Sequence, residues 1–173
     1  MQRSRALSLI EVIIAVVVLG LVAALTIPRL GQAAPPPDAR TELRAELKVL
    51  RVAIDLYHRD HDAFPGQCSD GTNPAGSVEA LVTQLTQFSD AAGNVSGQRD
   101  ATFCFGPYLR DGLPTCAVVD GAAQRGVLMV CGTARPMFSA DALGAAWVYN
   151  YETGQIVANT DALDEDGRPY ASY

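Results

Sequence analysis

One continuous apolar run near the N-terminus constrains this chain more than any other feature. The run extends from Ala6 to Ile27 and contains a single charged residue, Glu11. A helix of this length rises about 33 Å, which is enough to cross the hydrocarbon core of a bilayer. Because Arg3 and Arg5 precede the run, we expect the first residues to stay on the cytoplasmic side of the membrane. The rest of the chain would then lie on the opposite side.

The carboxylate of Glu11 separates this run from an ordinary secretory signal peptide. A signal peptide needs a polar segment and a small-x-small cleavage site after its apolar core, and it has no use for an acid near the start of that core. An ionisable side chain inside a membrane helix is costly, and by default it marks a function. We therefore favour a membrane segment in which Glu11 has a specific partner over a cleaved signal peptide or a featureless anchor.

The segment Arg5–Glu11, with the sequence RALSLIE, resembles the cleavage and methylation motif of type IV prepilins and type II secretion pseudopilins. In that family a short basic leader ends in a small residue, and an apolar residue, Ser or Thr, aliphatic residues and Glu follow. Family members also tend to have a proline 17 residues after the Glu, which is the position of Pro28. Ala6 replaces the usual Gly and Leu7 replaces the usual Phe.

The resemblance implies a processing site and an assembly site. A prepilin peptidase would cut between Ala6 and Leu7, and the new amine of Leu7 would be N-methylated. In a filament, that amine would neutralise Glu11 of a neighbouring subunit, because a lone carboxylate in hydrocarbon must either be protonated or meet a cation. Such a pair would set the axial register between subunits. Pro28 would weaken the helix locally, because it removes a backbone donor.

The chain divides into four predicted parts. Residues 1–6 form a basic leader, and residues 7–30 form a transmembrane helix that would also build a filament core. Residues 31–37 contain three consecutive prolines, which predict an extended hinge, because the residue before a proline avoids helical dihedrals. Residues 38–173 form the predicted periplasmic head.

Periodicity predicts an α+β head with a pilin-like fold, in which a long N-terminal helix packs on a small antiparallel sheet. Residues 38–60 carry apolar side chains at helical spacing, and residues 77–88 predict a shorter helix. Further on, 126–131 is an apolar strand, and 145–150 and 155–158 flank the hairpin turn 151–154. The stripe of the long helix consists of Leu43, Leu47, Leu50, Ile54 and Tyr57. The pattern Tyr57, Asp60, Phe64–Pro65 is similar to the end of the long helix in major, G-type pseudopilins.

Four cysteines lie in the predicted head: Cys68, Cys104, Cys116 and Cys131. An even number of cysteines in an oxidising compartment permits two disulfides, with three connectivities. We expect structural bridges, and we take Cys68–Cys104 with Cys116–Cys131 as the working pairing among the three. No Cys-x-x-Cys spacing is present, which argues against a zinc ribbon or a thioredoxin-like dithiol.

An acidic loop near the C-terminus contains Asp161, Asp164, Glu165 and Asp166. Calcium takes several oxygen ligands and tolerates irregular loops, but the spacing does not match an EF-hand. Major pseudopilins bind calcium in a loop near their C-terminus, so the resemblance implies a candidate calcium site at Asp161, Asp164 and Asp166. A solvated acidic loop without a metal stays open as the alternative. No other cofactor is expected.

The charge balance and the resemblance together give an expected function. With 13 basic and 19 acidic residues the net charge is −6, which excludes a nucleic-acid partner. The residues show no converging catalytic set, so we expect no enzyme. The resemblance implies a subunit of a type II secretion pseudopilus that waits in the inner membrane and then joins a periplasmic filament that supports protein export. Its partners would be further copies of itself, minor pseudopilins, the prepilin peptidase, the inner-membrane assembly platform and its ATPase.

Two alternatives stay open. The chain could be a type IV pilin for adhesion, motility or DNA uptake, although the short β region and the lack of a late cysteine pair argue against it. It could also be a membrane-anchored extracytoplasmic binding domain or enzyme. Replacing Glu11 with Ala separates these classes, because it should abolish the assembly of a pilin or pseudopilin and leave an anchored domain largely unaffected.

Overall fold

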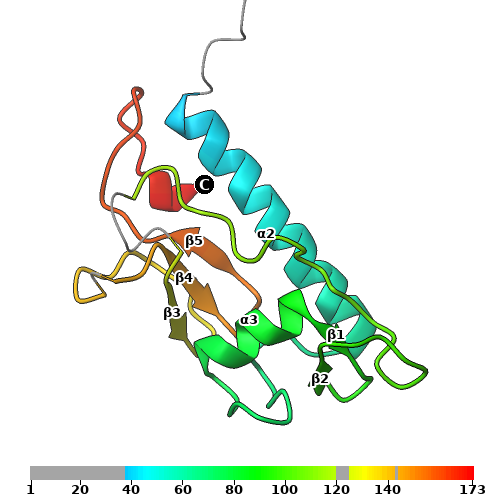
Figure 1. Ribbon diagram of the computed structural model, residues 1–173. Helices are drawn as coiled ribbons and strands as arrows, with labels where there is room; N and C mark the ends of the chain where they lie inside the picture. The colour runs from blue at the N-terminus through cyan, green and yellow to red at the C-terminus, as the bar shows by residue number, and fades with distance from the viewer. Residues whose placement is uncertain (1–37, 120–124, 143) are drawn as a thin grey trace, which may run out of the picture. The chain divides into compact units, whose positions relative to one another are not determined.

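The structure, a computed structural model, describes residues 38–119, 125–142 and 144–173. It therefore concerns the predicted head, because the predicted leader, membrane segment and hinge all lie outside the described residues. Within the described ranges, no helix has the combined length and hydropathy that a membrane span requires. Figure 1 shows a long helix, α2, beside a small sheet, with the shorter helix α3 near the end of α2 where the chain leaves that helix.

Helix α2 (Ala39–His61) begins and ends at residues that suit these positions. At its start, the side chain of Asp38 accepts a hydrogen bond from the N–H of Thr41 at 2.6 Å, which satisfies one of the free donors of the first turn. At its end, Asp62 adopts the left-handed conformation with φ 54°, and its N–H donates to the carbonyl of His58. The predicted helix over residues 38–60 is confirmed.

The predicted apolar stripe of α2 forms the centre of the head core. All five predicted stripe residues are at most 1% exposed, and they pack with the sheet and with α3 (Val78–Thr86). Helix α3 is capped by Ser77, whose hydroxyl accepts from the N–H of Ala80 at 3.2 Å. The core therefore holds the long helix along most of its length.

The main sheet contains three strands in the order β3–β4–β5, with β3 at Val127–Val130, β4 at Trp147–Asn150 and β5 at Ile156–Ala158. All four residues of β4 are buried, and Trp147 and Tyr149 belong to the core, as expected from their shared face. The indole N–H of Trp147 donates to the carbonyl of Pro114 at 3.2 Å, and the hydroxyl of Tyr149 donates to that of Pro65 at 3.0 Å. Both large polar side chains thus keep a partner inside the core.

The expectation of a wholly antiparallel sheet is wrong in one respect. Strands β4 and β5 form the predicted antiparallel hairpin, but β3 pairs with β4 in parallel. The long connection over residues 131–146 makes this possible, because parallel neighbours need a crossover rather than a tight turn. The sheet is therefore mixed, and the fold class α+β stands.

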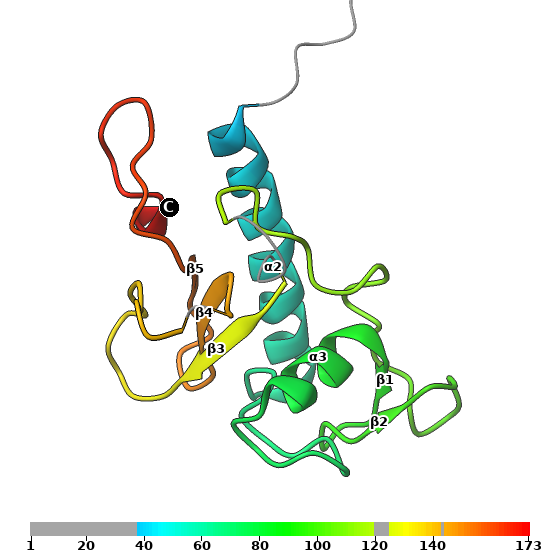
Figure 2. The same cartoon turned by 60° about the vertical axis from the view of Figure 1, so that its left-hand side comes forward.

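Two short strands, β1 (Phe88–Ser89) and β2 (Val95–Ser96), form a separate antiparallel ribbon, and the predicted helix over residues 77–88 ends before it, at Thr86. The carboxylate of Asp90 shapes their connection, because it accepts hydrogen bonds from the N–H groups of Ala92 and Asn94, both at 2.9 Å. Figure 2 shows this ribbon to the right of α3, on the side away from the main sheet. Strands of two residues carry no periodicity that a sequence could reveal.

Candidate functional site

The processing and assembly residues expected at the N-terminus, Ala6, Leu7, Glu11 and Pro28, lie outside the described residues. The head offers three other places for function. These are the acidic loop near the C-terminus, a polar cluster at the end of α2, and a groove between α2 and β5.

The acidic loop packs against the first turns of α2 and forms a cluster that we name the C-terminal clamp. The guanidinium of Arg40 donates to the carboxylate of Asp166 at 2.8 Å, and its Nε lies 3.7 Å from the carboxylate of Asp164. The hydroxyl of Tyr173 donates to Asp164, while the guanidinium of Arg44 lies 4.6 Å from the centre of the Tyr173 ring. These five residues tie the segment 164–173 to the start of α2.

Asp164 is the centre of the clamp. It is only 7% exposed, and its carboxylate accepts from the N–H groups of Asp166 and Arg168 at 2.9 and 2.8 Å. The hydrogen bond from Tyr173, these backbone donors and the nearby Arg40 charge together lower the pKa of Asp164 below its ordinary value. The residue therefore acts as an ionised anchor for the loop that surrounds it.

The three predicted calcium ligands do not converge. Asp161 is exposed and takes no part in the clamp, while Asp164 and Asp166 face the guanidinium of Arg40. Across residues 38–119, 125–142 and 144–173, no three or more His, Cys, Asp or Glu side chains gather as a metal-ligand set. The residues as arranged do not fit calcium, because Arg40 already supplies positive charge to two of the three carboxylates. Calcium binding by this loop stays a prediction.

The cysteines do not form the expected bridges. All four are free in the structure, with Cys116 buried and Cys68, Cys104 and Cys131 exposed. Burial raises the pKa of the Cys116 thiol to about 11, so this residue behaves as a small apolar core side chain.

Strand order explains why Cys68 and Cys104 stay apart. The segment after Cys68 contacts β2 and the segment after Cys104 contacts β1, so the two cysteines lie beside opposite edges of the β1–β2 ribbon. Three spacings of about 4.8 Å separate those two flanking segments, whereas a disulfide needs Cα atoms within about 7 Å. The second expected pair fails for another reason: Cys116 is buried beside α2, while Cys131 is exposed next to the hydroxyl of Tyr151. The order across the ribbon follows from the contacts Asp70–Val95, Val95–Ser89 and Ser89–Phe105.

A polar cluster closes the other end of α2. The hydroxyl of Tyr108 donates to the carboxylate of Asp60 at 3.0 Å, and Nε2 of His61 lies 3.3 Å from Tyr108 Oη and 3.1 Å from Ser89 Oγ. Burial lowers the pKa of His61. Because Ser89 is fully buried, the Ser–His pair has no access to a substrate. The cluster therefore joins the 88–108 region to α2, a role that no sequence motif indicated for Ser89.

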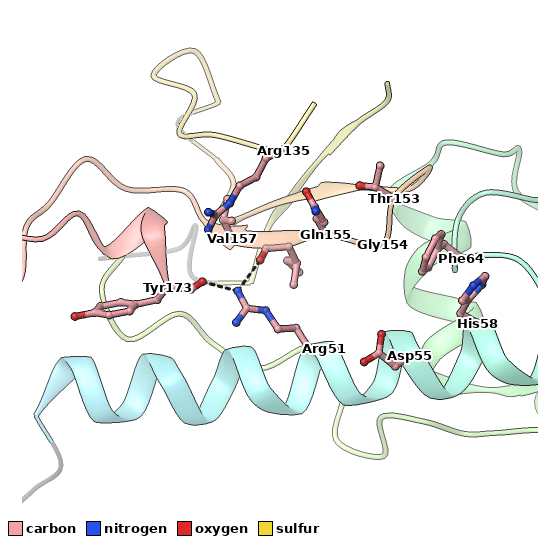
Figure 3. A pocket seen from close by; sticks show the side chains of 11 residues that line it. Arg51, Asp55, His58, Phe64, Arg135, Thr153, Gly154, Gln155, Val157 and Tyr173 are labelled. Atoms are coloured by element: carbon pink, nitrogen blue, oxygen red, sulfur yellow. Dashed lines mark hydrogen bonds between the residues drawn. The ribbon is translucent and has the colours of Figure 1, made fainter. Parts of the chain in front are cut away.

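The groove lies between α2 and the edge strand β5 and has a volume of about 540 Å³. Figure 3 shows Arg51 rising from α2 toward β5, with Arg135 approaching from the opposite side. His58 and Phe64 stand at one end of the groove, where their rings stack with centres 4.0 Å apart. Sequence reasoning did not find this groove, because Arg51 and Arg135 are 84 residues apart and share no motif.

The N-terminal residues match a known family description, "Prokaryotic N-terminal methylation motif", over residues 1–27. The motif that the segment Arg5–Glu11 predicted is thereby confirmed. The match covers the leader and the apolar run, and it does not extend to the head.

Two curated proteins are similar to this chain. Type II secretion system core protein G of Klebsiella pneumoniae is 34% identical over 65 residues, which cover 38% of this chain and 46% of that protein. The protein of the same name from Pseudomonas aeruginosa is 34% identical over 79 residues, which cover 46% of this chain and 50% of that protein. The chain thus spans about half the length of the curated relatives it matches. No solved structure matches the chain significantly. The chain carries a prepilin-type N-terminal methylation motif and is similar to the core protein G of type II secretion systems.

Proposed function

We propose that this chain is a structural subunit of a type II secretion pseudopilus, and that it has no catalytic activity of its own. The observation that carries the proposal is the methylation motif over residues 1–27, inside which Glu11 is the one charge of an apolar run. The similarity to two core G proteins supports the same role. The subunit would be anchored in the inner membrane by its apolar run and later joined to a periplasmic filament.

The chemistry of assembly follows from Glu11. After cleavage between Ala6 and Leu7, the amine of Leu7 is the nearest new cation in the apolar segment. An ionised carboxylate buried without a partner costs several kcal/mol, so a subunit gains by placing its Glu11 against the Leu7 amine of a neighbour. This pair would fix how far each subunit is shifted along the filament. Pro28, near the end of the run, would let the helix bend there.

The head would contribute surfaces rather than catalysis. Its core holds α2 along one side, and the C-terminal clamp joins Asp164 and Tyr173 to the first turns of that helix. The assembly platform, its ATPase, the prepilin peptidase and minor pseudopilins would be the partners during processing and assembly. These partners belong to the proposal and follow from the similarity alone.

The first experiment is a mass measurement on the protein taken from the membranes of its native cells. We expect a chain that begins at N-methylated Leu7. A chain that begins at Met1 would contradict processing, and one that begins near Ala34 would indicate an exported soluble protein. Either outcome would overturn the assigned roles of Leu7 and Glu11.

The second experiment replaces Glu11 in the full chain. Glu11→Ala should abolish filament formation in cells that overproduce the subunit, as judged by electron microscopy of sheared material. Glu79→Ala, which removes a carboxylate from α3 in the head, is the control and should leave filaments intact. Filaments of normal number and length from Glu11→Ala would contradict the proposal.

A further inference from the structure

The groove between α2 and β5 presents one face of the helix to the edge of the sheet. Arg51, Asp55 and His58 line it from α2, at spacings that place them on the same side of the helix. The β4–β5 turn and β5 itself form the opposite wall. Arg135 reaches the same groove from the connection between β3 and β4. A volume of about 540 Å³ accommodates a short stretch of peptide with its side chains.

The side chains that line the groove include two arginines, Arg51 and Arg135, and one acid, Asp55. Arg51 donates to the main-chain oxygens of Ile156 and Tyr173 at 3.3 and 2.7 Å, and Arg135 donates to that of Ser172 at 3.2 Å. Within the described ranges, neither guanidinium forms an ion pair with a carboxylate. Burial lowers the pKa of Arg51, and the charge of Arg135 lowers it further. Asp55 offsets one of the two arginine charges, so the lining side chains of Arg51, Arg135 and Asp55 together carry one positive charge.

Two residues that line the groove each bury one polar atom without a partner. Nδ1 of His58 and Oγ1 of Thr153 are buried and find no hydrogen bond among the described residues. The pairing of Val157 with Val148 directs the backbone groups of Ile156 and Ala158 away from β4. Because β5 is buried, a segment that enters the groove would meet its side chains rather than pair with the strand, and the flanking arginines favour a segment that carries carboxylates.

The chain itself carries a segment of this chemistry. Asp161 and Glu165 are exposed in the acidic loop and make no ion pair within the described part of the chain. In its own copy, the loop is held at Arg40 by the C-terminal clamp. Arg40 and Arg51 are 11 residues apart on one helix, so the clamp holds the loop about 16 Å along α2 from the groove. A second copy must therefore supply any acidic loop that enters the groove.

We propose that the α2–β5 groove binds the acidic loop of a neighbouring copy, with Arg135 and Arg51 facing Asp161 and Glu165. This inference rests on the proposed function, since it names the head contact by which the subunits would assemble. The groove and the loop are different patches of the same surface, so the contact is head-to-tail. Such contacts generate an open array of subunits rather than a closed dimer.

The test is a zero-length cross-link in filaments of the full chain. Lys48 is the one lysine of the sequence, so the double variant Lys48→Arg, Arg135→Lys carries a single side-chain amine, and it lies in the groove. A carbodiimide joins this amine to a touching carboxylate with loss of water. Filaments assembled from equal amounts of unlabelled and ¹⁵N-labelled subunits should then yield peptides that link position 135 to Asp161 or Glu165 and contain one partner of each label.

The matched control is Lys48→Arg, Arg99→Lys, which moves the amine to an exposed arginine outside the groove. It should give at least about fivefold less of the mixed-label peptide, which corresponds to about 1 kcal/mol of preference. Links that always carry a single label, or equal yields from the two variants, would overturn the proposal. So would links from position 135 to a different protein only.

A charge-reversal pair supplies a second readout. Arg135→Glu should lower the yield of filaments about fivefold, whereas Arg135→Glu combined with Glu165→Arg in the same chain should restore most of it. If Arg135→Glu assembles normally and its subunits still begin at methylated Leu7, the groove contact is wrong and the proposed function stands. If no subunit is processed or assembled in the wild type, the proposed function itself has failed.

Discussion

The two ends of α2 are attached to the rest of the head in different ways. At the end near His61, the attachments are deeper: the partly buried rings of Phe64 and His58 stack, and the side chain of Gln84 is fully buried. At the start of the helix, the C-terminal clamp relies on the partly exposed charges of Arg40 and Asp166. The attachment near His61 depends on packing and desolvation. The attachment at the start of α2 depends on ion pairs whose charges solvent and salt screen.

This difference predicts unequal local stability along one helix. Buried contacts and satisfied buried hydrogen bonds resist opening, whereas exposed ion pairs contribute little and weaken in salt. Segments held by few buried contacts open at a lower free energy than the core. We therefore expect the start of α2 to open locally before its end does. The following substitutions test this expectation at the two ends.

The largest effect is expected at Gly154, in the β4–β5 turn. Its φ is +69°, and a Cβ there would lie 2.3 Å from the Phe64 ring, which would displace the stack on His58. Gly154→Ala should lower the free energy of unfolding by about 3 kcal/mol, through backbone strain and overpacking together. Urea unfolding of the full chain in detergent, followed by the fluorescence of the one tryptophan, measures this change.

Gly112 is the matched control for that substitution. Its φ is +78°, but a Cβ there would meet no atom within 4 Å. Gly112→Ala should therefore cost only the backbone strain, about 1 kcal/mol. Equal losses at the two glycines would show that the Phe64 contact contributes nothing to the end of α2.

The next largest effect is expected at Gln84. Its carbonyl oxygen accepts from the N–H of Gly66 at 2.7 Å, and its amide donates to the carbonyl of Gly93 at 3.0 Å. Gln84→Ala leaves these buried backbone groups without a partner and should cost about 2 kcal/mol. Gln155→Ala, at an exposed position, should change the unfolding free energy by less than about 0.5 kcal/mol. A comparable change in the two variants would contradict the buried role of Gln84.

Gln84 and Gly154 also show what the sequence could and could not predict. The stripe from Leu43 to Tyr57 predicted α2 almost to the residue, because a helix packed on one side repeats its apolar positions. Alternating apolar residues and a turn predicted β4 and β5. Gln84 lies on the buried face of α3, but the sequence did not predict its burial, because glutamine is polar. Its partners are backbone groups of two loops that no sequence pattern connects to it.

The site was less predictable than the fold for a related reason. The methylation motif is a local pattern, and the sequence was sufficient to find it. The acidic loop was also found, but not its contact with Arg40, which lies 124 residues before Asp164 in the sequence. The disulfide expectation failed because the number of cysteines says nothing about the strand order that keeps Cys68 and Cys104 apart.

A pH dependence is expected at the buried end of α2. Burial lowers the pKa of His61 in the folded chain, and Asp60, Asp90 and Tyr108 are the ionisable groups that act on it there. In the unfolded chain, His61 binds a proton near its ordinary pKa of about 6.5. The unfolded state therefore binds more protons just below that pH, and stability should fall as the pH drops from 7 toward 5.5.

Comparison of the wild type with His61→Gln isolates this contribution. The wild type should lose more unfolding free energy between pH 7 and 5.5 than the variant, in which position 61 cannot be protonated. His58→Gln tests the other histidine of the helix end separately. Parallel pH profiles for the wild type and His61→Gln would contradict a buried neutral His61.

The smallest effect is expected at the C-terminal clamp. Arg40→Gln removes the partner of Asp166 and Asp164 and should lower the free energy of unfolding less than Gln84→Ala does, because the Arg40 side chain is 27% exposed and that of Asp166 is 57% exposed. The cost should shrink further in 1 M salt, where charges are screened over about 3 Å. The cost of Gln84→Ala should hardly change in salt, since neutral buried hydrogen bonds are not screened.

Amide exchange in the first turns of α2 is the most direct readout of the C-terminal clamp. Arg40→Gln should accelerate exchange there while leaving exchange in the turns near His61 unchanged. If the variant instead accelerates exchange along the whole helix, the two ends open together, and the proposed difference between them is wrong.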